Sequence, residues 1–469
     1  MKMWSGRFRQ PLDPEFEAWQ RSFDFDRRLL NYELQASAAH AKALKNAGIL
    51  SASELIAILQ GLEKIGNDAS SDERHAVAQD AAAEDIHHFV EKQLAECIGD
   101  VAYKLHSGRS RNEQIATDLR LFIRAAIDHL QSNLAELCFA FVYGAEQAGA
   151  AAMPAYTHLQ PAEPVLVGHW LLAYVEMFLR DADRLADCRK RLNLCPLGSG
   201  AVAGATLPLD RIFMAEELAF TAPTANSIDA TSDRDFAVEF VNALSLLALH
   251  LSRWAEEMII FSSLEFGFLQ LPESYSTGSS AMPQKKNPDL LELVRGKCGR
   301  VIGNATALII TMKGLPLAYN KDLQETQQPL FDATDTVMAM LPLIAGFMKA
   351  VEFDYARMQD AASAGFMNAW AAATCLVKKN IPSRQAHELI GKAVKLCIEK
   401  NCELGDLPLD ELRELSPAFD QDFYECLKPQ SVLAIHDVPG GTAPARVRQG
   451  IASAKKKIEA LREELHAHA

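Results

Sequence analysis

The sequence predicts an all-α protein built around a bundle of long helices. Apolar residues recur at spacings of three and four over long stretches, strand signals are scarce, and rigid segments rich in proline or glycine separate the stretches. In the first stretch the apolar stripe runs for about thirty residues, or roughly 45 Å of helix. The expected long helices cover approximately residues 115–141, 165–191, 235–264, 290–312 and 330–351. Helices of this length predict a bundle whose remaining apolar area favours association of subunits.

Length and charge limit the protein class. The chain has 469 residues and a formal net charge of −14, with 49% hydrophobic residues. It is too long for one ordinary core, and its acidity argues against a nucleic-acid or membrane-surface binder. Changes in helix pattern predict an N-terminal helical domain over 1–112, a central bundle over 113–351 and a C-terminal helical domain over 352–469.

Cysteine usage and hydropathy indicate the compartment. The first residues lack the apolar stretch of a secretory signal, and the most apolar segment, 238–271, is interrupted by charged residues. The nine cysteines are odd in number, scattered and never spaced Cys-x-x-Cys. We expect reduced thiols in a cytoplasmic protein, with no disulfide framework, zinc site or membrane span.

The N-terminal part predicts short helices over 29–47, 53–65 and 82–97, the second behind a capping box of Ser51 and Glu54. The third helix carries a polar cluster at i, i+3 and i+4 spacing, made of Glu84, His87, His88 and Glu91. Such spacing makes a metal site conceivable. Because no further ligand stands nearby in sequence, we expect no metal, and favour a polar helix face or a substrate contact.

A turn at residues 104–115 leads into the first long helix. Arg109, Arg111 and Asn112 present donors suited to carboxylates, and Gly108 permits an unusual backbone conformation. The alternative is a capped helix start with solvated arginines. Further along, the glycine-rich segment 196–204 lacks the features of a phosphate loop and predicts close backbone packing.

The connection between the first two long helices contains three prolines and His158, beside Thr157. An imidazole has a reference pKa of about 6.5 and can give or take a proton near neutrality. His158 is therefore a candidate general acid, with a polar surface residue as the alternative.

The loop between the third and fourth long helices is the richest in chemical groups. Gly278, Pro283 and Pro288 prevent a helix there, while hydroxyl, amide and ammonium groups crowd residues 279–287. Freed backbone N–H groups and two lysines could bind a carboxylate and stabilise developing negative charge. The alternative is a solvated helix connection.

The sequence of this loop closely resembles the signature of the fumarase/aspartase superfamily. It reads Gly278-Ser-Ser-Ala-Met-Pro-Gln-Lys-Lys-Asn-Pro288. Its Gln-Lys-Lys-Asn version is similar to the argininosuccinate lyase branch and the related delta-crystallins. Other segments extend the resemblance over nearly the whole chain, including Trp4-Ser-Gly-Arg-Phe8, 106–114, 156–160, 226–236, 315–324 and 440–444. The resemblance implies an all-α, three-domain, homotetrameric fold whose active sites each combine regions from three subunits.

The implied reaction is the reversible β-elimination of argininosuccinate to arginine and fumarate, the last step of arginine biosynthesis, without a cofactor. By matching position, Ser279 is the base, Lys285 and Asn287 hold the substrate carboxylate, His158 is the general acid and Glu292 orients it. A serine is a poor base unless N–H donors and a cation favour its ionised form. Positions that match substrate contacts are Ser22, His87, Arg111, Asn112, Thr157, Tyr319, Gln324 and Gln327.

One substrate position departs from the family pattern. Gln327 stands where a lysine is usual, and Glu113 replaces the usual aspartate. An amide still donates a hydrogen bond, so we expect weakened binding of the substrate at most.

Two alternatives remain for the function of the protein. One is another fumarate-releasing lyase, such as adenylosuccinate lyase, fumarase or aspartase. The other is a crystallin-like structural protein that has kept the fold without the activity.

Overall fold

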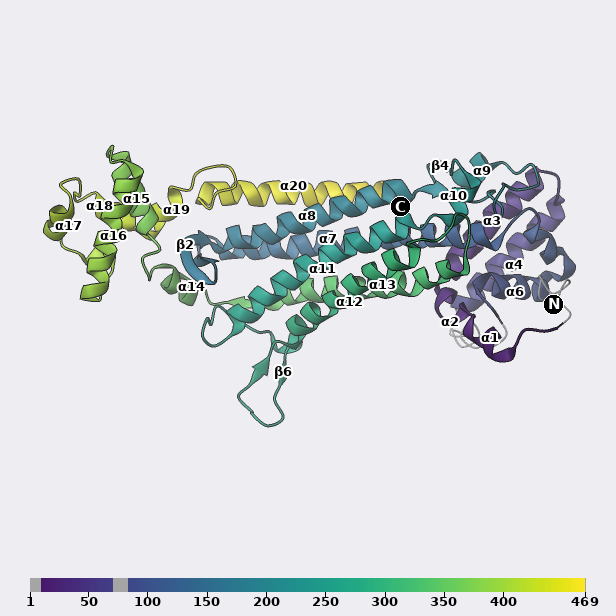
Figure 1. Cartoon of the computed structure of the whole chain (residues 1–469), viewed down its shortest axis with the longest axis horizontal. Coiled ribbons are helices and arrows are strands. Elements are labelled where there is room, and N and C mark those ends of the chain that lie inside the picture. Colours follow the sequence, from purple (N-terminus) through teal and green to yellow (C-terminus); the bar gives the residue numbers. More distant parts are fainter. Residues whose placement is uncertain (1–9, 71–82, 469) are drawn as a thin grey trace. The chain divides into compact units, whose positions relative to one another are not determined.

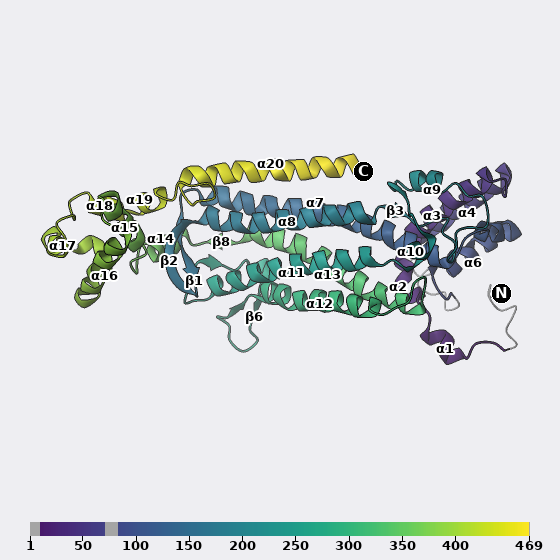
Figure 2. The ribbon, with the colours of Figure 1, turned by 45° about the horizontal axis from the view of Figure 1, so that its top comes forward.

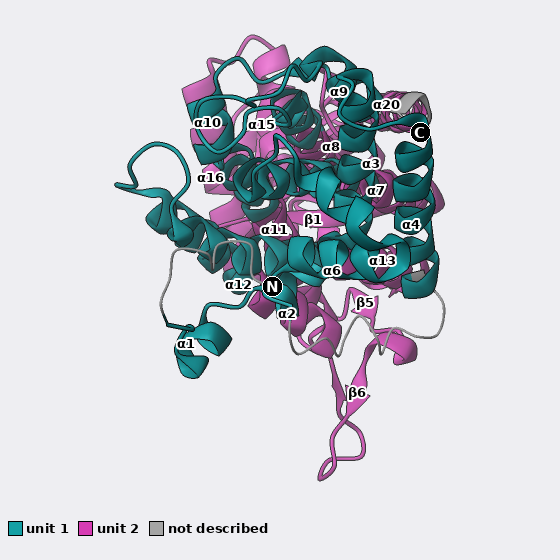
Figure 3. Cartoon of the chain, turned by 90° about the vertical axis from the view of Figure 1, so that its right-hand side faces the viewer, with its two compact units in different colours: residues 1–129, 183–246, 299–337 teal, residues 130–182, 247–298, 338–469 magenta. Residues whose placement is uncertain are grey.

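The computed structural model describes residues 10–70 and 83–468, and helices dominate this part of the chain. It divides into two compact units, each assembled from three segments (Figure 3). Unit 1 comprises residues 1–129, 183–246 and 299–337, and unit 2 comprises 130–182, 247–298 and 338–469. The strands that the structure describes form only two-stranded ladders. The prediction of an all-α fold is confirmed.

Five long helices, which Figure 1 labels, each have residues in both units. They are α7 (Arg111–Ala148), α8 (Val167–Leu192), α11 (Asp235–Ser262), α12 (Asp289–Met312) and α13 (Gln327–Ala350). All five were expected from apolar periodicity, and their bounds lie within a few residues of prediction except for α7, which is longer at both ends. At its N-terminal end the reason is that polar Arg111, Asn112 and Glu113 belong to the first turn, outside the apolar stripe.

The long helices are buried scaffold. In unit 1, Phe122 of α7 packs edge-on against Phe331 of α13, with ring centroids 5.1 Å apart. In unit 2, Phe141 of α7 packs against Phe178 of α8 and Trp254 of α11. Helix α11 and the segment Lys321–Ala350 are long and apolar enough to cross a membrane, but 56% and 61% of their most apolar windows are buried inside the protein. They have the burial expected of core helices.

Unit 1 adds the short N-terminal helices. Its other helices are α1 (Pro14–Trp19), α2 (Phe23–Asp26), η2 (Arg27–Leu29), α3 (Leu30–Asn46), α4 (Ala52–Ser70), α6 (Ile86–Ile98), η3 (Gly99–His106), α9 (Arg211–Glu217), α10 (Ser227–Ser232) and η5 (Lys321–Thr326). Strands β3 (Leu194–Cys195) and β4 (Ala222–Pro223) pair in parallel. The predicted capping box is confirmed, since Ser51 N donates to Glu54 Oε2 at 2.8 Å and Glu54 N donates to Ser51 Oγ at 3.2 Å.

Unit 2 contains the remaining strands. Strands β1 (Ala152–Thr157) and β2 (Gln160–Leu166) form an antiparallel hairpin (Figure 2). Strand β5 (Leu269–Gln270) pairs with β8 (Glu352–Phe353), and β6 (Thr277–Gly278) pairs with β7 (Lys286–Asn287). The sequence analysis expected only a proline-stiffened connection at residues 153–164. It missed the hairpin because prolines are poor strand formers away from sheet edges.

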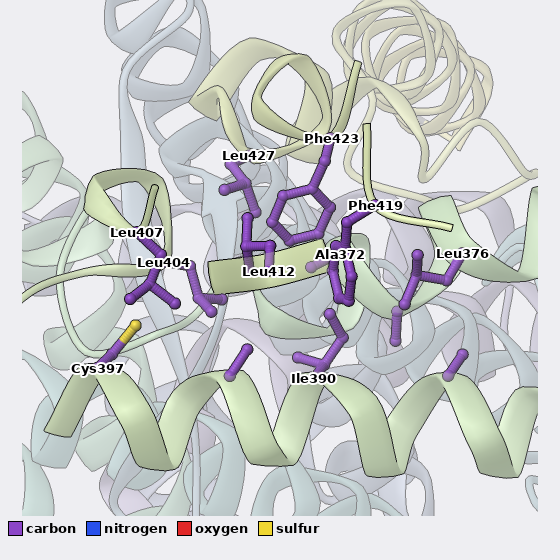
Figure 4. Packing of buried hydrophobic residues seen from close by; sticks show 13 residues of the cluster. Ala372, Leu376, Ile390, Cys397, Leu404, Leu407, Leu412, Phe419, Phe423 and Leu427 are labelled. Carbon is purple, nitrogen blue, oxygen red and sulfur yellow. The ribbon is translucent and has the colours of Figure 1, made fainter. Parts of the chain in front are cut away.

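Unit 2 also contains η4 (Glu273–Tyr275), which precedes β6, and a C-terminal series of mostly short helices. The series is α14 (Tyr355–Ala362), α15 (Ala369–Lys378), α16 (Ser383–Lys400), η6 (Leu404–Asp406), α17 (Leu409–Leu415), α18 (Phe423–Leu427), α19 (Pro429–Ala434) and the longer α20 (Pro444–His468). Leu376, Ile390, Phe419 and Phe423 belong to an apolar core that α15 to α18 share (Figure 4). The helical pattern of the sequence predicts a single helix over 356–379. This prediction is wrong, because Gly365 and Phe366 adopt left-handed φ values of 71° and 60° and separate α14 from α15.

Candidate active site

Unit 1 brings seven predicted site residues around one cavity of about 150 Å³. These seven are Ser22, His87, Arg111, Asn112, Tyr319, Gln324 and Gln327. They come from four places in the sequence: the loop before α2, the first turn of α6, the first turn of α7, and the segment around η5. The cavity walls are rich in hydrogen-bond donors, as a site for a carboxylate substrate requires.

The first turns of α6 and α7 meet through an ion pair. Arg111 Nη1 donates to Asp85 Oδ2 at 3.0 Å and lies 3.5 Å from Glu84 Oε2. Asp85 also caps α6, because its Oδ1 accepts from His88 N at 2.7 Å. Burial acts to raise the pKa of Asp85, but the Arg111 and His87 charges outweigh it and the net shift is downward. The carboxylate therefore stays charged and holds Arg111 at the cavity.

The His87 ring has a carboxylate near each of its two nitrogens. Its Nε2 lies 3.0 Å from Asp118 Oδ2 and its Nδ1 lies 3.9 Å from Asp85 Oδ1. Both His87 and Asp118 are buried. The ring is thus held between one carboxylate that lines the cavity and another that does not.

The η5 segment supplies the remaining side of the cavity. Gln324 Nε2 donates to the Gln20 carbonyl at 3.0 Å, which leaves its amide oxygen as an acceptor. Tyr319 is largely enclosed, and burial raises the pKa of its phenol. Gln327 is only 4% exposed, and its Oε1 has no hydrogen-bond partner among the described residues. A buried amide oxygen of this kind is costly unless a ligand or water satisfies it.

Five further residues line the same cavity: Asp26, Glu84, Asp85, Ile115 and Lys321. Of these, the sequence analysis named only Glu84, as part of the polar cluster on the predicted helix. Asp85 could have been found as the helix cap directly before the His87 turn. Lys321 stands between two predicted contacts, Tyr319 and Gln324, and is exposed to solvent. It gives the cavity a second cation besides Arg111.

His158 and Thr157 lie on the β1–β2 hairpin of unit 2. Thr157 pairs with Gln160, so His158 and Leu159 form a two-residue turn, with φ values of 55° and 57°. Such turns usually contain glycine or asparagine, because other residues are strained at positive φ. The strained turn projects the exposed imidazole beyond the last strand pair.

The loop between β6 and β7 carries the other predicted residues, and it extends away from the start of α12 (Figures 1 and 2). Backbone N–H groups of Ala281 and Met282 donate to Ser279 Oγ, at 3.3 Å and 3.1 Å. Lys285 is exposed, and Asn287 Nδ2 donates to Thr277 Oγ1 at 3.5 Å. The serine oxygen therefore accepts hydrogen bonds from two backbone N–H groups of its own loop.

Glu292 lies exposed in the first turn of α12. Within the described part of a single chain, no hydrogen bond or ion pair joins Glu292 to His158 or His158 to Ser279. These groups project from separate elements of unit 2, the hairpin, the β6–β7 loop and α12.

The side chains that could hold a metal ion differ from the cluster that helical spacing suggested. Glu33, His87 and Asp118 are buried, and one ligand atom from each lies within 4.8 Å of the others. Of these three, only His87 belonged to the cluster on the predicted helix. The two carboxylates come from α3 and α7, so helix periodicity could not reveal them.

Comparison with known proteins gives consistent relatives. A family model described as "Lyase" matches residues 6–303, and one described as "Argininosuccinate lyase C-terminal" matches residues 366–434. An argininosuccinate lyase from Koribacter versatilis is 60% identical over 469 residues, covering all of both chains. Another, from Acidobacterium capsulatum, is 58% identical over 97% of this chain and 95% of that protein.

Solved structures support the fold. An EDDS lyase in complex with formate has a TM-score of 0.85 and 27% identity, and the match covers 98% of this chain and 92% of that one. A class II fumarase from Schistosoma mansoni has a TM-score of 0.72 at 17% identity, covering 86% and 90% of the two chains. The second match shows the fold alone.

Proposed function

Since the chain belongs to the argininosuccinate lyase family of the fumarase/aspartase superfamily, and is a carbon–nitrogen lyase that releases fumarate from argininosuccinate, we propose that Ser279 and His158 are its base and acid. The observation that carries the proposal is the pair of N–H donors on Ser279 Oγ. Donors directed at an oxygen favour its ionised form, and a serine needs such help to remove a proton from carbon.

On the carbon side, Ser279 removes the proton next to a substrate carboxylate. The electrons move into that carboxylate, which gains negative charge in the transition state. Lys285 and Asn287, from the same loop, stabilise this charge. The C–H bond breaks, the C=C bond of fumarate forms, and the C–N bond to the guanidino group breaks.

On the nitrogen side, His158 gives a proton to the departing guanidino nitrogen. Its position at a hairpin tip suits a group that must enter a site formed elsewhere, and Glu292 orients the ring. One proton is removed and one is delivered, so the elimination balances without a cofactor.

The cavity in unit 1 binds the substrate. Arg111, Asn112 and Lys321 offer donors to carboxylates. Thr157, on the β1–β2 hairpin, would add its hydroxyl from another subunit of the assembly proposed below. Ser22, His87, Tyr319, Gln324 and Gln327 complete the contacts. Binding energy from these groups holds the reacting bonds in position, which lowers the barrier to elimination.

We also propose that the enzyme is a cytoplasmic homotetramer in which three subunits contribute to each site. The support is that Lys285, His158 and Glu292 are exposed in the single chain, whereas their chemistry requires a water-poor site. Exposed apolar residues on α12, namely Leu293, Ile302, Ile309 and Ile310, provide area for association. The bundle over 113–351 forms the core of this assembly, with 1–112 and 352–469 as separate helical domains.

Fumarate formation tests the activity on which the proposal rests. The purified enzyme should increase ultraviolet absorbance with argininosuccinate and give no signal with adenylosuccinate. Activity only with adenylosuccinate would favour another branch of the superfamily. No fumarate from either compound would leave the crystallin-like structural protein as the better interpretation.

A further inference from the structure

A buried cluster of polar residues lies behind His87, outside the proposed catalytic groups. Glu33 of α3 and Asp118 of α7 are 1% and 0% exposed. Gln114 Nε2 donates to Glu33 Oε1 at 3.1 Å, Ser37 Oγ donates to the same oxygen at 2.5 Å, and Arg109 Nη1 lies 3.8 Å from it. Burial on this scale is costly for carboxylates, so the cluster requires an explanation beyond packing.

The carboxylates of the cluster lie near only one of the two ring nitrogens of His87, Nε2. Nε2 lies 3.0 Å from Asp118 Oδ2 and 3.7 Å from Glu33 Oε2. Nδ1 lies on the side of Asp85, which lines the substrate cavity. Neither Glu33 nor Asp118 lines that cavity. The imidazole is therefore the side chain that joins the two carboxylates to the cavity by direct contact.

The protonation of the cluster is constrained. Burial raises the pKa of Glu33, and the Asp118 charge raises it further; burial also raises the pKa of Asp118. Glu33 Oε2 and Asp118 Oδ1 have no hydrogen-bond partner among the described residues. Two buried carboxyl groups this close are more stable when they share one proton. A single remaining negative charge then faces Nε2 and Arg109.

A metal ion is the competing occupant, because the three side chains could ligate one. Two observations favour the proton. The Arg109 guanidinium already provides a fixed positive charge beside Glu33. The neighbouring cavity, lined by Glu33, His87, Arg109 and Gln114, has a volume of only about 10 Å³, which is the space for a single water.

We propose that Asp118, supported by Glu33, is a positioning residue that binds His87 Nε2 and so holds the Nδ1 edge of the ring toward the substrate cavity. This rests on the proposed function, in which His87 contacts substrate. A carboxylate that accepts from one ring nitrogen fixes both the tautomer and the orientation of the other. Without it the ring can rotate, and the contact with substrate is lost.

A double-mutant cycle tests the proposal. Asp118→Asn should lower kcat/KM for argininosuccinate by about tenfold or more. In a His87→Asn background, the same substitution should cost less than about twofold, because its effect passes through the missing ring. An equal loss in both backgrounds would show that Asp118 acts independently of His87 and would overturn the proposal.

The chain offers a matched control. Asp181 and His250 form another buried pair, with Oδ2 and Nδ1 2.6 Å apart, in unit 2. Asp181→Asn should lower the melting temperature and leave kcat/KM within about twofold of the unmodified enzyme. If it lowered kcat/KM as much as Asp118→Asn, the effect would be a general result of losing a buried pair, and positioning would be wrong.

Two measurements do not depend on turnover, so they separate failure of this proposal from failure of the proposed function. A crystal structure of Asp118→Asn should show the His87 ring turned or in more than one conformer; one unchanged ring would contradict positioning. Metal analysis of the unmodified enzyme should find no stoichiometric ion. An ion that is bound there and lost in Asp118→Asn would make the cluster a metal site instead.

Discussion

The Ser22 hydroxyl donates a 2.6 Å hydrogen bond to Asp26 Oδ2, and both side chains are buried at the edge of the substrate cavity. Asp26 Oδ1 accepts from Ile86 N at 3.1 Å, so the same carboxyl group joins α2 to the helix turn that carries His87. Burial, followed by the nearby Asp85 charge, raises the pKa of Asp26 to about 7. Its titration should therefore be visible near neutral pH.

Asp26→Asn should flatten the pH dependence of stability. The pKa of Asp26 is higher in the folded protein than the value of about 3.9 in an unfolded chain, so folding takes up a proton between these values. This contribution to stability is complete below about pH 4 and is lost as the pH rises toward 7. Asparagine can keep both contacts without titrating. Urea unfolding between pH 5 and 8 should show a smaller slope for the variant, and an unchanged slope would contradict the assignment.

Ser279→Ala should reduce kcat by orders of magnitude, because the base is removed. The urea midpoint should stay the same, since the hydroxyl is bonded only within a surface loop. Ser363→Ala removes another hydroxyl of unit 2, which donates to the Gln359 carbonyl at 2.8 Å, and should leave the rate unchanged. A near-normal rate for Ser279→Ala would contradict the role of base.

His158→Asn removes the proposed proton donor and keeps the conformation of the hairpin turn. Asparagine accepts the left-handed conformation that His158 adopts at φ 55°, so the hairpin should form normally. We expect a loss of orders of magnitude in kcat with an unchanged melting temperature. A variant that turned over argininosuccinate at nearly the normal rate would show that the leaving nitrogen takes its proton from elsewhere.

Gln327→Lys should lower KM for argininosuccinate, because the lysine would add positive charge to a cavity that binds a carboxylate substrate. Gln328 provides the control, since it is exposed and does not line the cavity. Gln328→Lys adds the same charge and should leave KM unchanged. If Gln327→Lys left KM unchanged or raised it, the absence of the usual lysine would not weaken argininosuccinate binding, and this explanation would be wrong.

Much of the fold follows from the sequence, because apolar periodicity predicts the five long helices. The β1–β2 hairpin did not follow, since its strands contain prolines and its turn uses His158 and Leu159 at positive φ. Seven substrate residues could be named by matching motifs, and unit 1 places them around one cavity. The pairing of His87 with Asp118 needed coordinates, because contacts between α6 and α7 leave no spacing pattern in sequence.

The most direct test mixes two inactive variants. Ser279→Ala and His158→Asn, each inactive alone, should be unfolded together in equal amounts and refolded. If each site takes its base and acid from different subunits, roughly one quarter of the sites will receive both intact groups, and about that fraction of the normal rate of fumarate release should return. No recovery above the separate variants, from a mixture shown to contain hybrid assemblies, would contradict a shared base-and-acid site.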